Sequence, residues 1–151
     1  MKTEEGSTLQ PNLLAKRIRE NLLSQKEKLQ NYLAILEMEE SDIKSQDADR
    51  LIRHIEAEKN IIDELNSFKK ILDPLEVIYS NSPYKKDSAI AELKNGIKKL
   101  STQVAIKSEK NKEILDTVIK GVKLNLKNKQ KLNVGVNSYK RVESHYIDIS
   151  G

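Results

Sequence analysis

The sequence contains no cysteine, no tryptophan and one phenylalanine among its 151 residues. Without cysteine it has no disulfide framework, no thiolate metal site and no cysteine nucleophile. Aromatic residues make up 4% of the chain and charged residues 33%. That balance is too polar for a thick globular core and is typical of long, half-exposed helices, so the composition favours one thin, all-α domain.

Long hydrophobic runs are also absent. Apolar runs such as Leu33–Leu36 are far shorter than the roughly 20 residues that a membrane-spanning helix needs. The first residues, from Met1 to Ser7, are acidic and polar, which argues against a secretory signal. From these absences we expect a soluble, cytoplasmic protein without membrane insertion.

Catalytic and cofactor motifs are equally scarce. The five glycines are isolated, so no phosphate-binding loop can be read. The two histidines, His54 and His145, have no neighbour at metal-ligand spacing. The acidic run Glu37–Glu40 lacks a Glu-x-x-His companion, and we expect it to be a solvated helix face. We therefore predict a binding protein, with no enzymatic activity and no cofactor.

The apolar spacing predicts two helices that form an antiparallel hairpin. The first runs from about residue 11 to 43, and Pro11 suits a first helical position. The second begins near Asp47, a good N-cap. Only Ser45–Asp47 separates the two, which leaves room for a tight reversal. The apolar stripes are Leu14, Ile18, Leu22, Leu29, Leu33 and Leu36 in the first helix, and Leu51, Ile55, Ile62, Leu65, Phe68 and Leu72 in the second.

Pro74 should interrupt the second helix, because it cannot donate to the carbonyl four residues back. Asp73-Pro74-Leu75-Glu76 also has the pattern of a new helix start, so we expect a short extra helix to about Ser80. The predicted organisation is a disordered N-terminus (1–10), the hairpin (11–81), a loop (82–86), a long third helix (87–133) and a flexible tail (134–151).

The third helix carries a seam that steps alternately by three and four residues, as in a coiled coil. It is apolar from Ile90 to Val104 and then mixed, with Lys107 and Asn111 among the breaks. At 1.5 Å per residue this helix reaches about 70 Å, against about 45–50 Å for the hairpin helices. If it packs antiparallel to the second helix, the portion beyond about Lys120 has no partner. The expected fold is all-α: an antiparallel helical hairpin plus a long third helix, as a three-helix bundle or coiled coil with an extended C-terminal tail.

Charge is unevenly distributed, with a net of −4 over residues 1–93 and +8 over residues 94–151. The basic half indicates either an interaction surface or a solvated face. Nucleic acid is disfavoured as a partner because Arg141 is the one arginine of that half and its aromatics lie in the tail. A self-associating structural coiled coil is a second alternative. The chain is expected to be a monomer or a homodimer.

Several elements in order resemble the FlgN family of flagellar type III export chaperones. They are Ile35-Leu36 with Glu39, the turn Asp47-Ala-Asp49, Glu58-Lys59 followed by Ile61-Ile62 and Leu65, then Asn111, Ile114-Leu115, Val118-Ile119 and Asn128-x-x-x-Leu132. The final HYIDISG is similar to the Tyr-x-x-x-x-Gly ending of that family. The resemblance covers about residues 12–151.

The resemblance implies a cytoplasmic chaperone that binds the C-terminal helices of hook–filament junction (hook-associated) proteins, prevents their premature assembly and delivers them to the flagellar export gate. It also implies a client-binding site on the third helix, formed by Asn111, Ile114, Leu115, Val118, Val122 and Leu126. Contact with the export gate is expected from Tyr146, with Ile147 and Ile149 as further anchors. Two alternatives remain open: the inner apolar residues complete the core of the chain itself, and the tail folds back onto the bundle.

Overall fold

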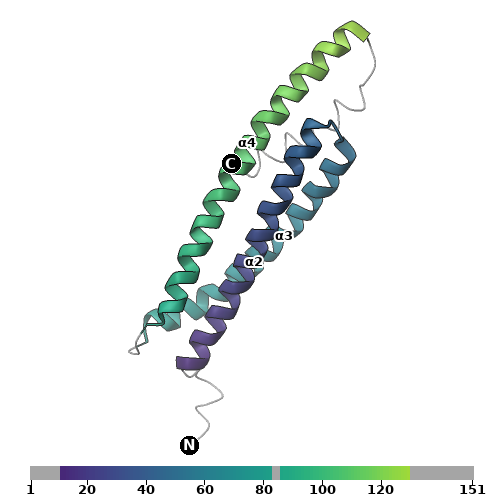
Figure 1. The fold of residues 1–151 in the computed structure, drawn as a ribbon. Coiled ribbons are helices and arrows are strands. Elements are labelled where there is room, and N and C mark those ends of the chain that lie inside the picture. The colour runs from purple at the N-terminus through teal and green to yellow at the C-terminus, as the bar shows by residue number, and fades with distance from the viewer. Residues whose placement is uncertain (1–10, 83–85, 130–151) are drawn as a thin grey trace, which may run out of the picture.

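The computed structural model describes the backbone of residues 11–82 and 86–129 and the side chains of residues 12–82 and 86–125. Three helices account for nearly all of this part: α2 (Pro11–Lys44), α3 (Ala48–Ser80) and α4 (Ser88–Lys129). Figure 1 shows α2 and α3 as an antiparallel hairpin, with α4 running alongside α2 and projecting beyond the α2–α3 turn. The protein is an all-α three-helix bundle, as the apolar spacing predicted.

The turn between α2 and α3 is held by backbone hydrogen bonds and by the predicted cap. Gln46 has a positive φ of 59° and its N–H donates to the Ile43 carbonyl, while the Asp47 N–H donates to the Asp42 carbonyl. These two bonds form a Schellman motif, which closes a helix with one residue in the left-handed region. The Asp47 side chain then accepts a hydrogen bond from the Arg50 N–H as the N-cap of α3.

The predicted restart of the helix at Pro74 is wrong, because α3 continues without interruption from Ala48 to Ser80 with Pro74 inside it. A proline in a helix interior removes one backbone hydrogen bond and costs about 3 kcal/mol or more. Packing compensates for part of this cost, since Leu72, Leu75 and Tyr79 all contact the same hydrophobic cluster on either side of the proline.

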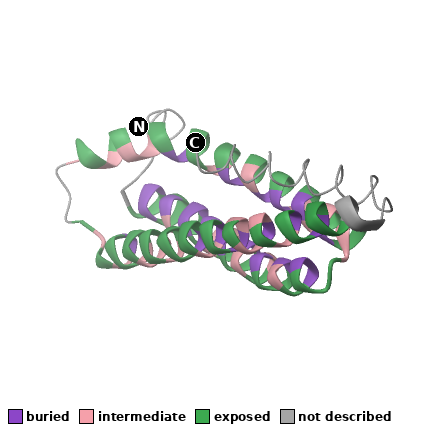
Figure 2. Cartoon of the chain, turned by 90° about the horizontal axis from the view of Figure 1, so that it is seen from above, coloured by how far each residue is buried: buried purple, intermediate pink, exposed green. Residues whose placement is uncertain are grey.

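Two hydrophobic clusters form the core. The smaller one joins the start of α2, the end of α3 and the start of α4, around Ile18, Leu72 and Ile90. The larger one surrounds Leu36 and extends from Leu29 of α2 to Leu115 and Ile119 of α4. Figure 2 shows that the buried residues follow one side of each helix, while the outer sides are exposed.

α2 is the shared partner of both other helices. It packs along both α3 and α4, whereas no pair of Cα atoms from α3 and α4 within the described residues lies within 8 Å. Side chains connect α3 and α4 where the chain passes between them: Lys94 pairs with Glu76 at 2.8 Å, and the Tyr79 hydroxyl accepts a hydrogen bond from the Asp87 N–H. The third helix therefore depends mainly on α2, with which it runs parallel, and not on α3 as the sequence suggested.

Candidate functional site

Four of the predicted client-binding residues, Asn111, Ile114, Leu115 and Val118, lie where α4 packs against the larger hydrophobic cluster. Asn111 and Leu115 are fully buried and Val122 is 5% exposed. Ile114 and Val118 are half-buried and border the larger hydrophobic cluster. The side chain of Leu126 lies outside the described side chains, and Tyr146, Ile147 and Ile149 lie outside the described residues altogether.

Asn111 connects α4 directly to α2. Its side-chain amide donates a 2.8 Å hydrogen bond to the Leu36 carbonyl, between two helices that are far apart in sequence. Its Oδ1 atom and the Oγ atom of Ser108 are buried and have no hydrogen-bond partner among the described residues. The heptad spacing predicts Asn111 as a polar break in the apolar seam, and in the structure this residue is an interhelical hydrogen-bond donor.

Asn111 belongs to a buried polar set that also includes Tyr32, Glu39, Glu58 and Ser108. Glu39 and Glu58 are 0% exposed, so the prediction of a solvated Glu37–Glu40 face is wrong at Glu39. Burial, together with the negative charge and hydrogen bonding of Glu58, raises the pKa of Tyr32 above its ordinary value. Tyr32 belongs to the larger cluster, and Asn111 donates to the carbonyl of Leu36 within it. A buried polar group stabilises a fold only when its hydrogen bonds are satisfied.

An ion-pair network fixes α4 beside α2 at the edge of this set. Glu40 accepts hydrogen bonds from Lys107 of α4 and from Lys44 of its own helix. These hydrogen bonds, first that of Lys107, lower the pKa of Glu40 from 4.5 to about 2. Glu40 is therefore ionised at neutral pH and holds the two helices together through charge. Lys107, the other predicted break in the seam, also forms an interhelical contact.

A second charged group, which the sequence patterns did not predict, lies near the turn between α2 and α3. The Asp42 carboxylate is almost completely buried, and it lies 2.5 Å from His54 Nδ1 and 3.5 Å from Arg50 Nε. All three residues belong to α2 and α3, so the group closes the hairpin near its turn. The signal was present in the sequence: Asp42 precedes the buried Ile43, and His54 and Arg50 are one turn apart on α3.

Within residues 11–82 and 86–129, no three histidine or acidic side chains are grouped as the ligands of a metal ion would be. In the same part of the chain, no helix has both the length and the hydropathy needed to cross a bilayer. The described residues form a long helix, α4, whose C-terminal half contacts the hairpin through apolar, polar and charged side chains.

The fold and this site define the class of protein as an all-α three-helix bundle with one helix longer than its partners. No family model matches the sequence. An "Uncharacterized protein" of Treponema pallidum (strain Nichols) is 29% identical over 100 residues, which cover 66% of this chain and 64% of the relative. The matched region thus spans just under two thirds of that relative's length. No solved structure matches significantly.

Proposed function

We propose that this chain is a flagellar export chaperone of the FlgN type. In this proposal it binds the C-terminal helices of hook-associated junction proteins in the cytoplasm, prevents their premature assembly and delivers them to the export gate, without a cofactor or a catalytic step. The observation that supports it most directly is the arrangement of α4, which projects past the hairpin and is attached there by a seam interrupted with polar residues.

The edge of α4 formed by Ile114 and Val118 is the part of the predicted client site that is accessible to another helix. An amphipathic client helix would pack against these side chains in a helix-in-groove mode. Full burial of an exposed aliphatic side chain contributes roughly 1.5–3 kcal/mol, and these two are already half-buried. Their contribution is therefore a few kcal/mol, whereas micromolar binding requires about 8 kcal/mol.

The rest of the binding free energy requires more apolar surface than Ile114 and Val118 offer. Leu115 belongs to the same predicted site but is buried in the larger cluster, so a client reaches it only if the C-terminal half of α4 moves away from the hairpin. The unpartnered atoms of Ser108 and Asn111 reduce the cost of this movement, because they regain hydrogen bonds to water when they are exposed. Client binding by exchange of helix partners is thus the mechanism we propose.

The test is binding of a peptide that comprises the C-terminal helices of a hook-associated protein, measured by calorimetry with the purified chain. Ile114→Glu combined with Val118→Glu should reduce its affinity at least about tenfold, because two charges replace apolar contacts. Ile106→Glu is the matched control, since Ile106 is a 64% exposed aliphatic residue of the same helix. Unchanged affinity in the double variant, or equal loss in the control, contradicts a client site at this edge.

The proposed contact with the export gate has a separate test. Tyr146→Ala should leave the affinity for the client peptide unchanged while secretion of the client from cells fails. If the variant loses client affinity, Tyr146 acts in client binding and not in delivery.

A further inference from the structure

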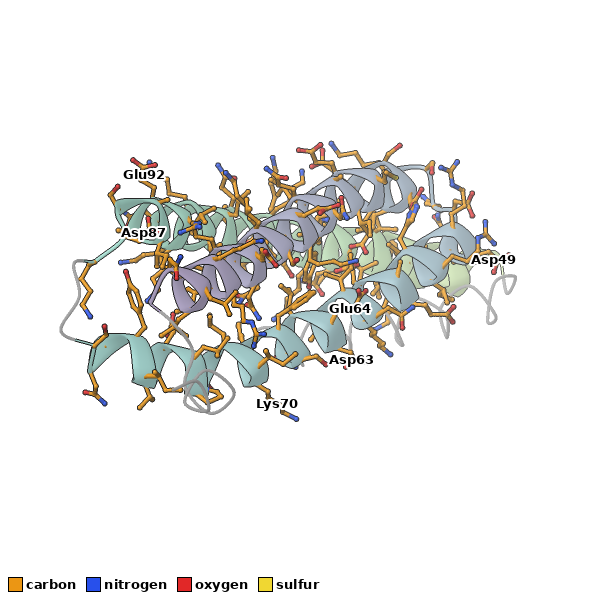
Figure 3. The ribbon with its side chains drawn as sticks, turned by 90° about the horizontal axis from the view of Figure 1, so that it is seen from below. Asp49, Asp63, Glu64, Lys70, Asp87 and Glu92 are labelled. Atoms are coloured by element: carbon orange, nitrogen blue, oxygen red, sulfur yellow. The ribbon has the colours of Figure 1, made fainter. Side chains whose placement is uncertain are left out.

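The side of the bundle where α3 and α4 face each other, the α3–α4 side, is not formed by direct packing of these two helices. Packed helices have their axes about 8–10 Å apart, but no Cα atom of α3 lies within 8 Å of one of α4 in residues 11–82 and 86–129. Each helix is aligned through α2 instead. Lys28 of α2 pairs with Glu64 of α3 at 2.9 Å, and Figure 3 shows Glu64 on the side of α3 that faces α2.

Two buried carboxylates, Glu39 of α2 and Glu58 of α3, lie at one level of the hairpin. Asp42 pairs with His54 near the turn. Because α2 and α3 are antiparallel, one turn back along α2 leads from Asp42 to Glu39, and one turn on along α3 leads from His54 to Glu58. Both carboxylates are 0% exposed. Buried charges in proteins are paired, so this level is suited to a cation.

α4 adds buried polar atoms at the same level. Asn111 donates to the carbonyl of Leu36, which lies one turn before Glu39. Asn111 Oδ1 and Ser108 Oγ are buried and have no hydrogen-bond partner among the described residues. We call Glu39, Glu58, Ser108 and Asn111 the acidic layer. A basic segment with backbone N–H groups would provide both the charge and the hydrogen-bond donors that this layer can bind.

From the acidic layer we infer that residues 132–141 of the same chain dock on the α3–α4 side and bring two cations to the layer. These residues lie outside the described part of the chain. Their sequence, LNVGVNSYKR, is uncharged except for its last two residues, Lys140 and Arg141. The charge of the segment is thus concentrated at one end, as pairing with a single acidic layer requires.

The length of chain beyond α4 agrees with this placement. Eighteen residues lead from Asn111 to Lys129, the last residue of α4, which corresponds to about 27 Å of helix at 1.5 Å per residue. An extended chain returns over that distance in about eight residues at about 3.3 Å each. Twelve residues lead from Gln130 to Arg141, so about four remain for the reversal of direction. The two cations therefore reach the level of Asn111.

A segment docked in this way connects α4 to α3. It opposes the movement of α4 that exposes Leu115, so it regulates client binding; this consequence rests on the proposed function. The docking itself depends only on the acidic layer and on the sequence of the segment.

The test is hydrogen exchange of the purified full chain, with mass spectrometry of the peptides that contain residues 132–141. We expect their amides to exchange at least about tenfold more slowly than in a synthetic peptide of the same sequence. Lys140→Gln combined with Arg141→Gln should remove this protection without unfolding the described helices, since both residues lie beyond them. Amides that exchange as fast as in the free peptide, or protection that survives the double change, overturn the inference. Protection that increases with protein concentration assigns the layer to the segment of a second copy and overturns docking within one chain.

Glu58→Gln tests the other side of the contact. It should reduce the protection of residues 132–141, with circular dichroism as the check that the helices remain folded. Glu56→Gln is the matched control, because Glu56 is an exposed glutamate of the same helix and its replacement should leave the protection unchanged. Full protection in a folded Glu58→Gln chain, or equal loss in the control, contradicts pairing at the acidic layer. If Glu58→Gln unfolds the bundle, the double variant of the segment decides.

The client-peptide assay separates the docking from its consequence. Lys140→Gln combined with Arg141→Gln should raise the affinity for the client peptide several-fold, because the segment no longer holds α4 to α3. Lost protection with unchanged affinity overturns the regulatory consequence and leaves the docking standing. Absence of any client binding contradicts the proposed function, whereas the hydrogen-exchange result does not depend on a client.

Discussion

Leu115→Ala distinguishes a core role of Leu115 from a role as an exposed client contact. Leu115 is 0% exposed and belongs to the larger cluster around Leu36. Replacement of a buried leucine by alanine costs about 2–5 kcal/mol, since it removes apolar contact and leaves a cavity. A domain of this size is stabilised by about 5–15 kcal/mol in total. We therefore expect Leu115→Ala to remove about 3 kcal/mol, a large share of the free energy of unfolding.

The assay is urea denaturation followed by circular dichroism. With a slope of about 2 kcal/mol per molar urea, a loss of about 3 kcal/mol lowers the midpoint by about 1.5 M. Ile106→Ala is the control, and as an exposed substitution it should change the stability by less than about 0.5 kcal/mol. A loss below about 1 kcal/mol for Leu115→Ala would refute the packing of this part of α4 against the hairpin, and would make Leu115 available to a client without any movement.

Three further changes test the contacts between helices. Asp42→Asn should lower the free energy of unfolding by about 1–3 kcal/mol in urea denaturation, because the replacement weakens the hydrogen bond to His54 and removes the ion pair with Arg50; an unchanged midpoint would contradict that role. Lys107 lowers the pKa of Glu40 to about 2, so the stability that Glu40 contributes is complete above pH 4.5 and is lost as the pH falls towards 2. Glu40→Gln should therefore flatten the fall of Tm between pH 4.5 and pH 2. An equally steep fall in the variant would contradict a stabilising role of the ionised Glu40. Gln46→Gly should raise the stability by about 0.5–1 kcal/mol, because glycine adopts the left-handed conformation without steric cost; a loss would contradict the turn geometry.

The helices and the hairpin turn were predictable from the sequence because they depend on local signals. Pro11 and Asp47 mark the helix starts where the structure has them, and the ends of α2 and α3 lie close to the predicted ones, whereas the predicted end of the third helix lies outside the described residues. Pro74 was misjudged because its effect depends on tertiary packing, which no local pattern reports.

The predicted seam of α4 coincides with the buried side at Ile90, Val104 and Asn111, but Ser108 is buried in place of Lys107, and the two differ at each position beyond Asn111. A strict heptad predicts Ile114, Val118 and Gly121 as the next positions, but the residues that are buried are Leu115, Ile119 and Val122. A straight helix has 3.6 residues per turn and drifts by about 20° per heptad from a 3.5-residue repeat. The buried side follows the 3.6-residue period from Val104 to Val122, so the seam is that of a straight helix and not of a coiled coil.

The buried carboxylates could not be predicted, although they fall on the apolar stripes. Glu39 lies three residues after Leu36, and Glu58 lies three residues after Ile55. A glutamate is almost never fully buried, so a solvated position is the reasonable prediction when the third helix is not yet placed. Only the assembled helices show that both side chains are enclosed.

The position of α2, which packs along both α3 and α4, determines the order in which the chain can fold. Contacts within the hairpin join residues such as Asp42 and His54, which are 12 positions apart, whereas Asn111 reaches Leu36 across 75 positions. Short loops close at a lower entropic cost than long ones, so the hairpin forms first and α4 adds to it afterwards. As the chain emerges from a ribosome, α2 and α3 can already be paired while the last helix is still being made.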